Sequence, residues 1–346
     1  KYRRPITINN TANSNDLTDY QVLITLDTAS LISAGKMRSD CGDIRFTDSD
    51  GITLLNYWIE SGCNTTNTRI WVKVPSIPAS STKTIYVYYG NPSATSLSNG
   101  ANTFIFFDDG NYYSSWTQGT YACTQDTAGN PGPSYKCLSS SGYYAYRNVG
   151  VDYSGTSGVY TVIKVDMYST GLGNVFFLVN SSGYGQMIRL DTRTTDYSGI
   201  AATTSWTSWE CPGTAPGTPA CAQNSPNFNL EPNKNEEAAS TWYRYNITIN
   251  GTNILIVCNE VRNYCTSTPS IGSSLRVSAG GISSQTYIGI VGDGQGTSYY
   301  TLFDNFRIYK LTSPDPTYSI GAEEIAITNQ PPYVETPKTF DSNLNE

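Results

Sequence analysis

Histidine is absent from this 346-residue chain, and basic residues are few. Without histidine, neither a Ser-His-Asp triad nor a Cys-His catalytic pair can form. The 21 lysine and arginine residues are outnumbered by 28 aspartate and glutamate residues, which gives a net charge of −7. Because phosphate binding depends on clustered Lys and Arg, nucleic acid is not expected as a partner.

Long apolar runs and Cys-x-x-Cys motifs are also missing. A helix that crosses a membrane needs about 18 or more consecutive apolar residues, so no membrane span is predicted. The chain starts at Lys1 rather than at a Met followed by an apolar stretch. We therefore expect a mature product that was secreted with its signal peptide removed, located outside the cell or on its surface.

Eight cysteines are present, and they fall as four pairs of close neighbours. An even number of cysteines in a chain expected to be secreted favours disulfides over metal ligands. The sequence leaves the connectivity open, and pairing between nearest neighbours is the simplest expectation. These neighbours are Cys41 and Cys63, Cys123 and Cys137, Cys211 and Cys221, and Cys258 and Cys265.

Five Asn-x-Ser/Thr sequons fit an extracellular chain that carries glycans on its loops. Such motifs also arise by chance in a sequence rich in Asn and Thr. The candidate glycosylation sites are Asn9, Asn64, Asn180, Asn246 and Asn250.

Short segments of β-branched and aromatic residues, separated by turn residues, run through most of the chain. This spacing predicts an all-β protein of two antiparallel β-sandwich domains. Residues 84–89, Thr-Ile-Tyr-Val-Tyr-Tyr, give the strongest strand signal. The polar stretch 90–100 predicts a linker, so the domains are expected at 1–98 and 103–323, followed by an extended tail over 324–346.

Several motifs carry a likeness to known families. Residues 43–46 (DIRF), 57–60 (YWIE), 70–75 (IWVKVP) and 86–92 (YVYYGNP) resemble an uncharacterised domain of archaeal and bacterial surface proteins, a domain of unknown function. Residues 106–109 (FFDD) and 303–309 (FDNFRIY) resemble the concanavalin A-like, LamG-type jelly roll that commonly accompanies it. The resemblance implies two sandwiches and an extracellular setting, and it brings no established activity.

Catalysis is not expected. Jelly-roll glycosidases need two carboxylates at a fixed separation, and the Glu-x-Asp-x-x-Glu strand pattern of sandwich glycosidases occurs nowhere in the chain. We therefore predict a protein that is not an enzyme and requires no cofactor.

Structural calcium is the metal that the sequence leaves open, because hard oxygen ligands often join strand ends in sandwiches. Asp108 and Asp109 at the start of the second domain would lie near Asp304 if its first and last strands pair. The alternative role of these residues is to cap turns.

Aromatic residues give a further candidate, a platform for surface glycans. The candidates are Trp206 and Trp209 beside a Pro-rich segment, and Tyr143 and Tyr144. The alternative is that these rings pack within the sandwich, because tyrosine is also a favoured strand residue.

Assembly from identical subunits is the last feature read from the sequence. Ile325 and Ile327 alternate as in a strand, and Tyr333 and Val334 follow, so the tail could add to a sheet edge of another copy. The alternative is packing on its own chain. The sequence thus predicts a structural or adhesive surface protein, a homo-oligomer or filament joined by strand addition. A pair of carbohydrate-binding modules from a secreted glycoside hydrolase is the alternative.

Overall fold

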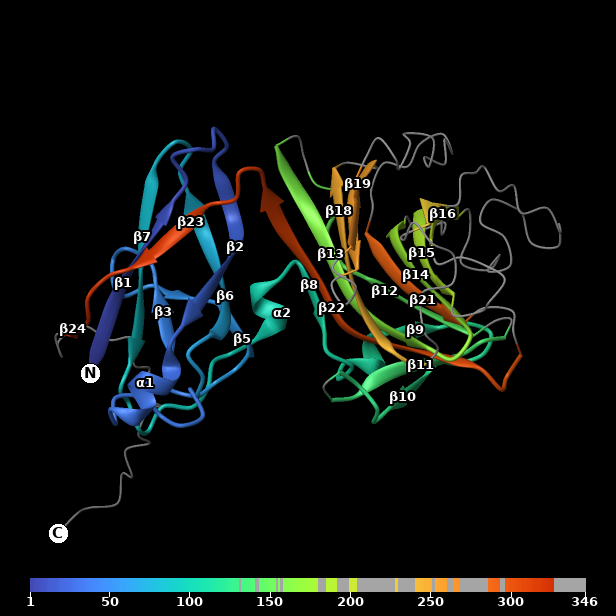
Figure 1. Ribbon diagram of the computed structural model, residues 1–346, viewed down its shortest axis with the longest axis horizontal. Helices are drawn as coiled ribbons and strands as arrows, with labels where there is room; N and C mark the ends of the chain where they lie inside the picture. The colour runs from blue at the N-terminus through green and yellow to red at the C-terminus, as the bar shows by residue number, and fades with distance from the viewer. Residues whose placement is uncertain are drawn as a thin grey trace, which may run out of the picture. The chain divides into compact units, whose positions relative to one another are not determined.

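The computed structural model describes residues 1–130, 132–140, 143–153, 155, 158–179, 185–191, 199–203, 228–229, 240–250, 253–259, 264–267, 286–292 and 296–326. Almost all of its elements are β-strands, and neighbouring strands within each sheet run antiparallel (Figure 1). The chain divides into two compact units, one of Lys1–Thr103 together with the chain from Pro314 onward, the other of Phe104–Ser313. The predicted all-β class is confirmed.

The first unit consists of two sheets. The larger contains β23 (Thr317–Ile320), β1 (Tyr2–Asn9), β7 (Thr82–Tyr89), β3 (Arg45–Thr47) and β4 (Leu54–Leu55) in that order, with β24 (Glu324–Ile325) also on β1. The smaller contains β2 (Leu17–Leu26), β6 (Thr68–Ile77) and β5 (Tyr57–Ser61). The helix α1 (Thr28–Ser33) follows β2 and is capped by Asp27, whose side chain accepts a hydrogen bond from the Ser30 backbone.

Alternation along the strands builds the core of this unit. Successive residues of a strand point to opposite faces of the sheet, and Ile6 and Ile8 of β1 are fully buried, as are Ile85 and Val87 of β7. The interior is therefore made by the alternating apolar residues from which these strands were predicted.

The C-terminal part of the chain lies elsewhere than expected. Residues up to 323 were assigned to the second domain, yet β23 pairs with β1 of the first unit, with Ile6 opposite Ile320. The pairing continues in β24, where Tyr2 lies opposite Ile325. The physical reason is that β1 would otherwise be an open sheet edge.

The stretch expected to be a linker belongs to the first unit. Buried Arg45 donates a 2.5 Å hydrogen bond from Nη2 to the Thr95 carbonyl, and Arg38 Nη1 donates to the carbonyls of Pro92 (3.0 Å) and Ala94 (2.8 Å). Residues 92–95 are thereby held against β3, and the N-terminal segment of the unit ends with the short helix α2 (Gly100–Thr103). Polar turn residues alone do not distinguish a linker from such a fixed segment.

The second unit is a sandwich of two larger sheets. One runs β10 (Thr124–Asp126), β11 (Ser134–Leu138), β22 (Tyr300–Thr312), β13 (Val159–Ser169), β18 (Trp242–Asn250), β19 (Asn253–Asn259) and β20 (Tyr264–Ser267), with β8 (Phe106–Asp108) also on β22. The other runs β17 (Phe228–Asn229), β16 (Gly199–Thr203), β15 (Gly185–Asp191), β14 (Leu172–Val179), β21 (Tyr287–Gly292), β12 (Tyr144–Asn148) and β9 (Thr117–Gln118).

The chain passes repeatedly between these sheets, from β11 to β12 to β13 to β14, which is the connectivity of a jelly roll. The first and last strands of the unit, β8 and β22, pair antiparallel, as the sequence analysis assumed. A turn of 3-10 helix, η1 (Tyr113–Ser115), follows β8.

The core of the second unit fixes which face of β13 and β18 points outward. Ile163, Val165 and Met167 of β13 are buried in the apolar core with Tyr245 and Ile247 of β18. The even-numbered residues of both strands therefore point to the other face of the sheet, which we call the outer face; it is buried at Lys164 and Asp166 and partly exposed at Tyr168.

Candidate functional site

The candidate site is a row of three aromatic side chains on that outer face of the second unit. They are Tyr300 of β22, Tyr168 of β13 and Trp242 of β18, and each is partly exposed. Tyr168 lies opposite Trp242 in the register of β13 with β18. Neighbouring strands thus bring together three residues that are far apart in the sequence, and we call them the aromatic row.

The rings of the aromatic row touch. The Tyr168 and Trp242 ring centroids are 5.5 Å apart, and those of Tyr168 and Tyr300 are 6.2 Å apart with the planes within 20°. Lys136 Nζ lies 4.2 Å from the centroid of the Tyr300 ring and 3.4 Å from the carboxylate of Asp126. Burial, together with the neighbouring Tyr168, raises the pKa of Tyr300.

A polar row lies one step along the strands. Asp166 and Arg244 are two residues before Tyr168 and two after Trp242, so they share the outer face. Arg244 donates two 2.6 Å hydrogen bonds to the Asp166 carboxylate. On the other side of Asp166, Asp304 of β22 occupies the paired position. The Asn305 backbone after it is left-handed, with φ of 52°, where the register of β22 shifts.

Burial shifts the pKa of Asp304 away from the ordinary aspartate value. Its carboxylate is buried and accepts hydrogen bonds from the backbones of Asn130 (2.6 Å) and Asn305 (2.7 Å). Burial, aided by the charges of Asp166 and Asp109, raises the pKa of Asp304 to about 7. With this pKa the carboxyl is protonated at mildly acidic pH, where an ordinary aspartate is ionised.

The three residues proposed as calcium ligands have different surroundings. Asp108 is fully buried and accepts hydrogen bonds from Tyr135 (2.6 Å), Trp116 (2.7 Å) and Arg147 (2.9 Å). Burial raises the pKa of Asp108 despite these donors. The Asp108 carboxylate thus joins the side chains of Tyr135, Trp116 and Arg147 through hydrogen bonds. Among the residues that the structure describes, no group of three or more His, Cys, Asp or Glu side chains could hold a metal ion.

The tyrosine platform predicted from the sequence is only partly within the described residues. Tyr143 stacks on Tyr121 with centroids 5.2 Å apart, and Tyr144 stacks on Tyr146 at 6.5 Å. Tyr143 also packs against the core of the second unit. Trp206 and Trp209 lie outside the described residues, so the platform stays a prediction.

The part of the predicted joining strand that is described lies on its own chain. Ile325 pairs with Tyr2, and its side chain is 80 % exposed. Ile327, Tyr333 and Val334 lie outside the described residues. The alternative in which the tail packs back on its own chain therefore applies to residues 324–326.

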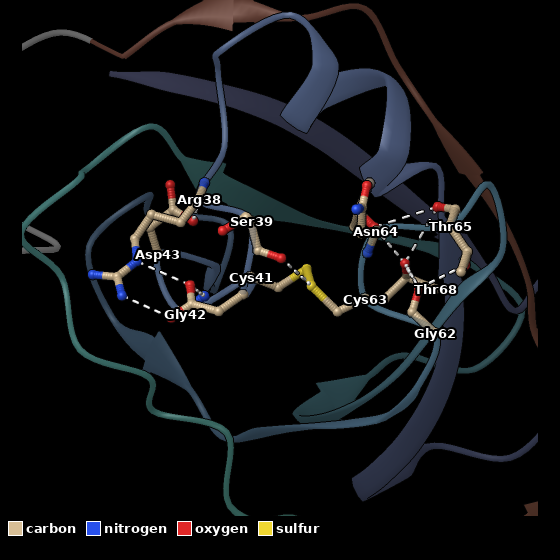
Figure 2. The surroundings of a disulfide bond; sticks show 12 residues. Arg38, Ser39, Cys41, Gly42, Asp43, Gly62, Cys63, Asn64, Thr65 and Thr68 are labelled. Carbon is tan, nitrogen blue, oxygen red and sulfur yellow. Dashed lines mark hydrogen bonds and ion pairs between the residues drawn. A yellow bond between two sulfur atoms is a disulfide. The ribbon is translucent and has the colours of Figure 1, made fainter.

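Two of the expected disulfides are formed, Cys41 to Cys63 and Cys123 to Cys137. Figure 2 shows the first, which joins the segment after α1 to the turn that carries Asn64. Cys258 and Cys265 lie opposite each other in the β19–β20 hairpin. Cys211 and Cys221 lie outside the described residues.

The sequons differ in their surroundings. Asn9 and Asn64 are exposed, whereas Asn246 is in the middle of β18 and its side-chain oxygen is buried. Asn250 ends β18, and Asn180 lies outside the described residues.

The sequence alone could not reveal the aromatic row. Each of its residues reads as an ordinary strand tyrosine or tryptophan, and only the register of β22, β13 and β18 makes them neighbours. The one usable signal was alternation. Tyr168 and Trp242 are at even-numbered positions, whereas the core-forming apolar residues of their strands are at odd-numbered positions and point to the opposite face.

The fold is that of an all-β protein with two units of antiparallel sheets. A comparison with family models matches residues 40–119 to the family described as Domain of unknown function (DUF2341). This confirms the resemblance to an uncharacterised domain over those residues. The comparison with curated proteins finds no match.

Solved structures give further similarities. The carbohydrate recognition domain of Emp46p in its metal-free form is 15% identical, with a TM-score of 0.35, over 58% of this chain and 91% of that one. Its potassium-bound form is 13% identical, with a TM-score of 0.35, over 57% and 88%. The binding domain of botulinum neurotoxin serotype G is 11% identical, with a TM-score of 0.27, over 57% and 44%. Likeness at this level does not say what this chain binds.

In the described part of the chain, no helix has the length and hydropathy needed to cross a bilayer.

Proposed function

We propose that this chain is a non-enzymatic, extracellular structural and adhesive surface protein whose copies join by strand addition. The observation that carries the proposal is the edge strand formed by residues 317–325, which lie along β1 of the first unit. This segment reaches β1 only after the chain has built the whole second unit. The acceptor and the donor strand therefore belong to opposite ends of the chain.

This segment is held on β1 by main-chain hydrogen bonds and by side-chain contacts, the two kinds of contact that hold a peptide added to a sheet edge. Arg3 pairs with Glu324 at 2.7 Å, and the Tyr89 hydroxyl donates to Glu323 at 2.8 Å. Main-chain bonds continue through Gly321, whose backbone donates to the Pro5 carbonyl at 2.8 Å. Main-chain hydrogen bonds supply the attraction and side chains fix the register, as in strand addition between proteins.

The connection that precedes the segment suits an exchange between copies. Residues 313–316 read Ser-Pro-Asp-Pro, and each residue before a proline favours extended backbone. If the segment left its own β1 for that of a neighbour, every contact above would form again between chains. Because donor and acceptor are different surfaces, the exchange is head to tail and would extend into a filament unless it closed as a ring.

An extracellular setting agrees with the chemistry of both units. Each unit contains a disulfide among its described residues, Cys41–Cys63 in the first and Cys123–Cys137 in the second, and disulfides persist in oxidising surroundings. Glycans at exposed sequons would add protection.

Strand exchange can be tested by mixing two singly substituted chains. Thr7 lies opposite Ser319, so a Thr7→Cys chain refolded together with a Ser319→Cys chain should form a disulfide between chains, located by peptide mapping. The matched control uses Thr84, which lies opposite Thr7 on β7 within the same unit. Thr7→Cys mixed with Thr84→Cys should give no such link.

Electron microscopy and sedimentation of the native chain complete the test. Fibres or polymers support the proposal. Separate monomers at every concentration, with no link between Thr7→Cys and Ser319→Cys chains, would refute it.

Carbohydrate binding is the second candidate function, as in a module pair from a secreted glycoside hydrolase. The aromatic row favours it, because aromatic side chains with a few polar groups at their border are common features of small-molecule sites.

A further inference from the structure

The aromatic row is a surface feature that the core of the second unit does not need. The core is built by the residues that alternate with them along the strands and point to the opposite face, such as Val165 and Met167 of β13. Tyr300, Tyr168 and Trp242 point to the other face and keep part of their surface in solvent. The three rings contact one another on one sheet face, so their partly exposed edges lie next to each other.

We propose that this face binds a neutral glycan chain, with Tyr168 and Trp242 as the central stacking residues. The inference deepens the adhesive part of the proposed function and does not depend on strand exchange. The negative face of an aromatic ring attracts the C–H groups of one side of a pyranose ring. The Tyr168 ring lies between the other two, 5.5 Å from the Trp242 ring and 6.2 Å from the Tyr300 ring, so a sugar stacked on Tyr168 would also lie near one of its neighbours.

Polar groups at the border of the row suit a ligand rich in hydroxyl groups. The Asp166–Arg244 pair lies one step along β13 and β18 from the rings, and the Arg244 side chain is 29% exposed. Lys136 lies at the other end, over Tyr300. Asp166 itself is buried, so the groups that could reach sugar hydroxyls are the Arg244 guanidinium at one end of the row and Lys136 at the other.

The charges indicate a neutral glycan over a sulfated or phosphorylated one. Each cation at the border already has a carboxylate partner, Lys136 with Asp126 and Arg244 with Asp166. An anionic ligand would have to compete with these carboxylates, whereas a sugar hydroxyl can accept a hydrogen bond from the exposed part of Arg244 or Lys136 while each ion pair stays in place.

The test measures binding of the full chain to immobilised neutral glucans, mannans and galactans, with a sulfated glycan as a separate arm. Tyr168→Ala and Trp242→Ala should each weaken binding to the preferred neutral glycan by at least about tenfold. Tyr300→Phe keeps the ring and should change affinity by less than about threefold.

Tyr160→Ala is the matched control. Tyr160 is on the same strand and the same face as Tyr168 and is also partly exposed, but it lies eight residues away, on the order of 27 Å along β13. It should bind as the native chain does. Circular dichroism and urea unfolding of each variant show whether a loss of binding reflects a loss of fold.

Every outcome bears on the proposal. Selective loss in folded Tyr168→Ala and Trp242→Ala supports it. Equal loss in Tyr160→Ala, native affinity in Tyr168→Ala, binding of the sulfated glycan alone, or no binding to any neutral glycan would overturn it. The result is independent of whether the chains exchange strands, so failure here leaves the assembly proposal standing.

Discussion

Arg244 and Asp166 form a two-point ion pair across β18 and β13, in which Nε and Nη2 each donate a 2.6 Å hydrogen bond to a different carboxylate oxygen. Asp166 is fully buried, and Asn305 Nδ2 also donates to it at 2.9 Å. One carboxylate thus joins β18 to the position where β22 shifts its register.

Removal of the arginine should therefore destabilise the second unit. Arg244→Met leaves a buried carboxylate without its cation, and we expect a loss toward the lower end of the about 3–5 kcal/mol that breaking a buried pair costs, because Arg244 is partly exposed. Lys136→Met is the control. Its pair with Asp126 is partly exposed on both sides and should contribute less than about 1 kcal/mol. Urea unfolding of both variants checks this, and equal losses would contradict it.

Asp304 should make stability depend on pH in a defined window. Its pKa is raised from 3.8 to about 7 by burial, so the folded state holds a proton that the unfolded state releases. Stability from this group is present below about pH 4, falls as the pH rises toward about 7, and is level above that. The slope inside the window is at most about 1.4 kcal/mol per pH unit.

Asp304→Asn should remove this slope. Asp108 also has a raised pKa and contributes in the same direction, so the native chain and the variant must be compared at each pH from about 4 to 8. Asp152→Asn, an exposed control, should run parallel to the native chain. Parallel curves for Asp304→Asn and the native chain would refute the prediction.

Strand positions were largely predictable from sequence, but sheet assignment was not. The stretch 54–61 reads as one continuous strand, yet it breaks at Asn56 into β4 and β5, which belong to different sheets. The break is fixed by a long-range contact, since the Asn56 carbonyl accepts a hydrogen bond from the Lys73 backbone at 2.9 Å. Hydrophobic alternation carries no information about such a partner.

The site was less predictable than the fold for the same reason. The strands β8 and β22 pair as assumed, with Asp108 opposite Phe306, but the donors around Asp108 come from Trp116, Tyr135 and Arg147 on other elements. Whether an aspartate binds a cation or accepts hydrogen bonds from side chains depends on these neighbours, which only the folded chain brings together.

The two described disulfides should differ in their access to reductant. Cys123 and Cys137 are buried, with 1% and 0% of their surface exposed, whereas Cys63 is partly exposed at a turn. Because exchange requires a thiolate to reach a sulfur atom, mild reductant should open Cys41–Cys63 first. Alkylation at timed intervals followed by peptide mapping measures the order. Earlier labelling of Cys123 and Cys137 would contradict it.

Glycan occupancy should follow the strand pairing. Asn9 and Asn64 are exposed, and Asn9 Oδ1 accepts hydrogen bonds from the Thr11 hydroxyl (2.7 Å) and backbone (3.0 Å), so these sequons are accessible in the folded chain. Asn246 lies between β13 and β19 with its side-chain oxygen buried, and a glycan there would oppose the pairing of β18. Glycopeptide mass spectrometry of the secreted chain should find glycans at Asn9 and Asn64 and none at Asn246. Thr11→Ala should abolish the glycan at Asn9, whereas Thr248→Ala, which removes the sequon of Asn246, should leave the pattern unchanged. A folded chain that carries a glycan on Asn246 would contradict this prediction, because it would show that β18 accommodates a glycan at a buried position.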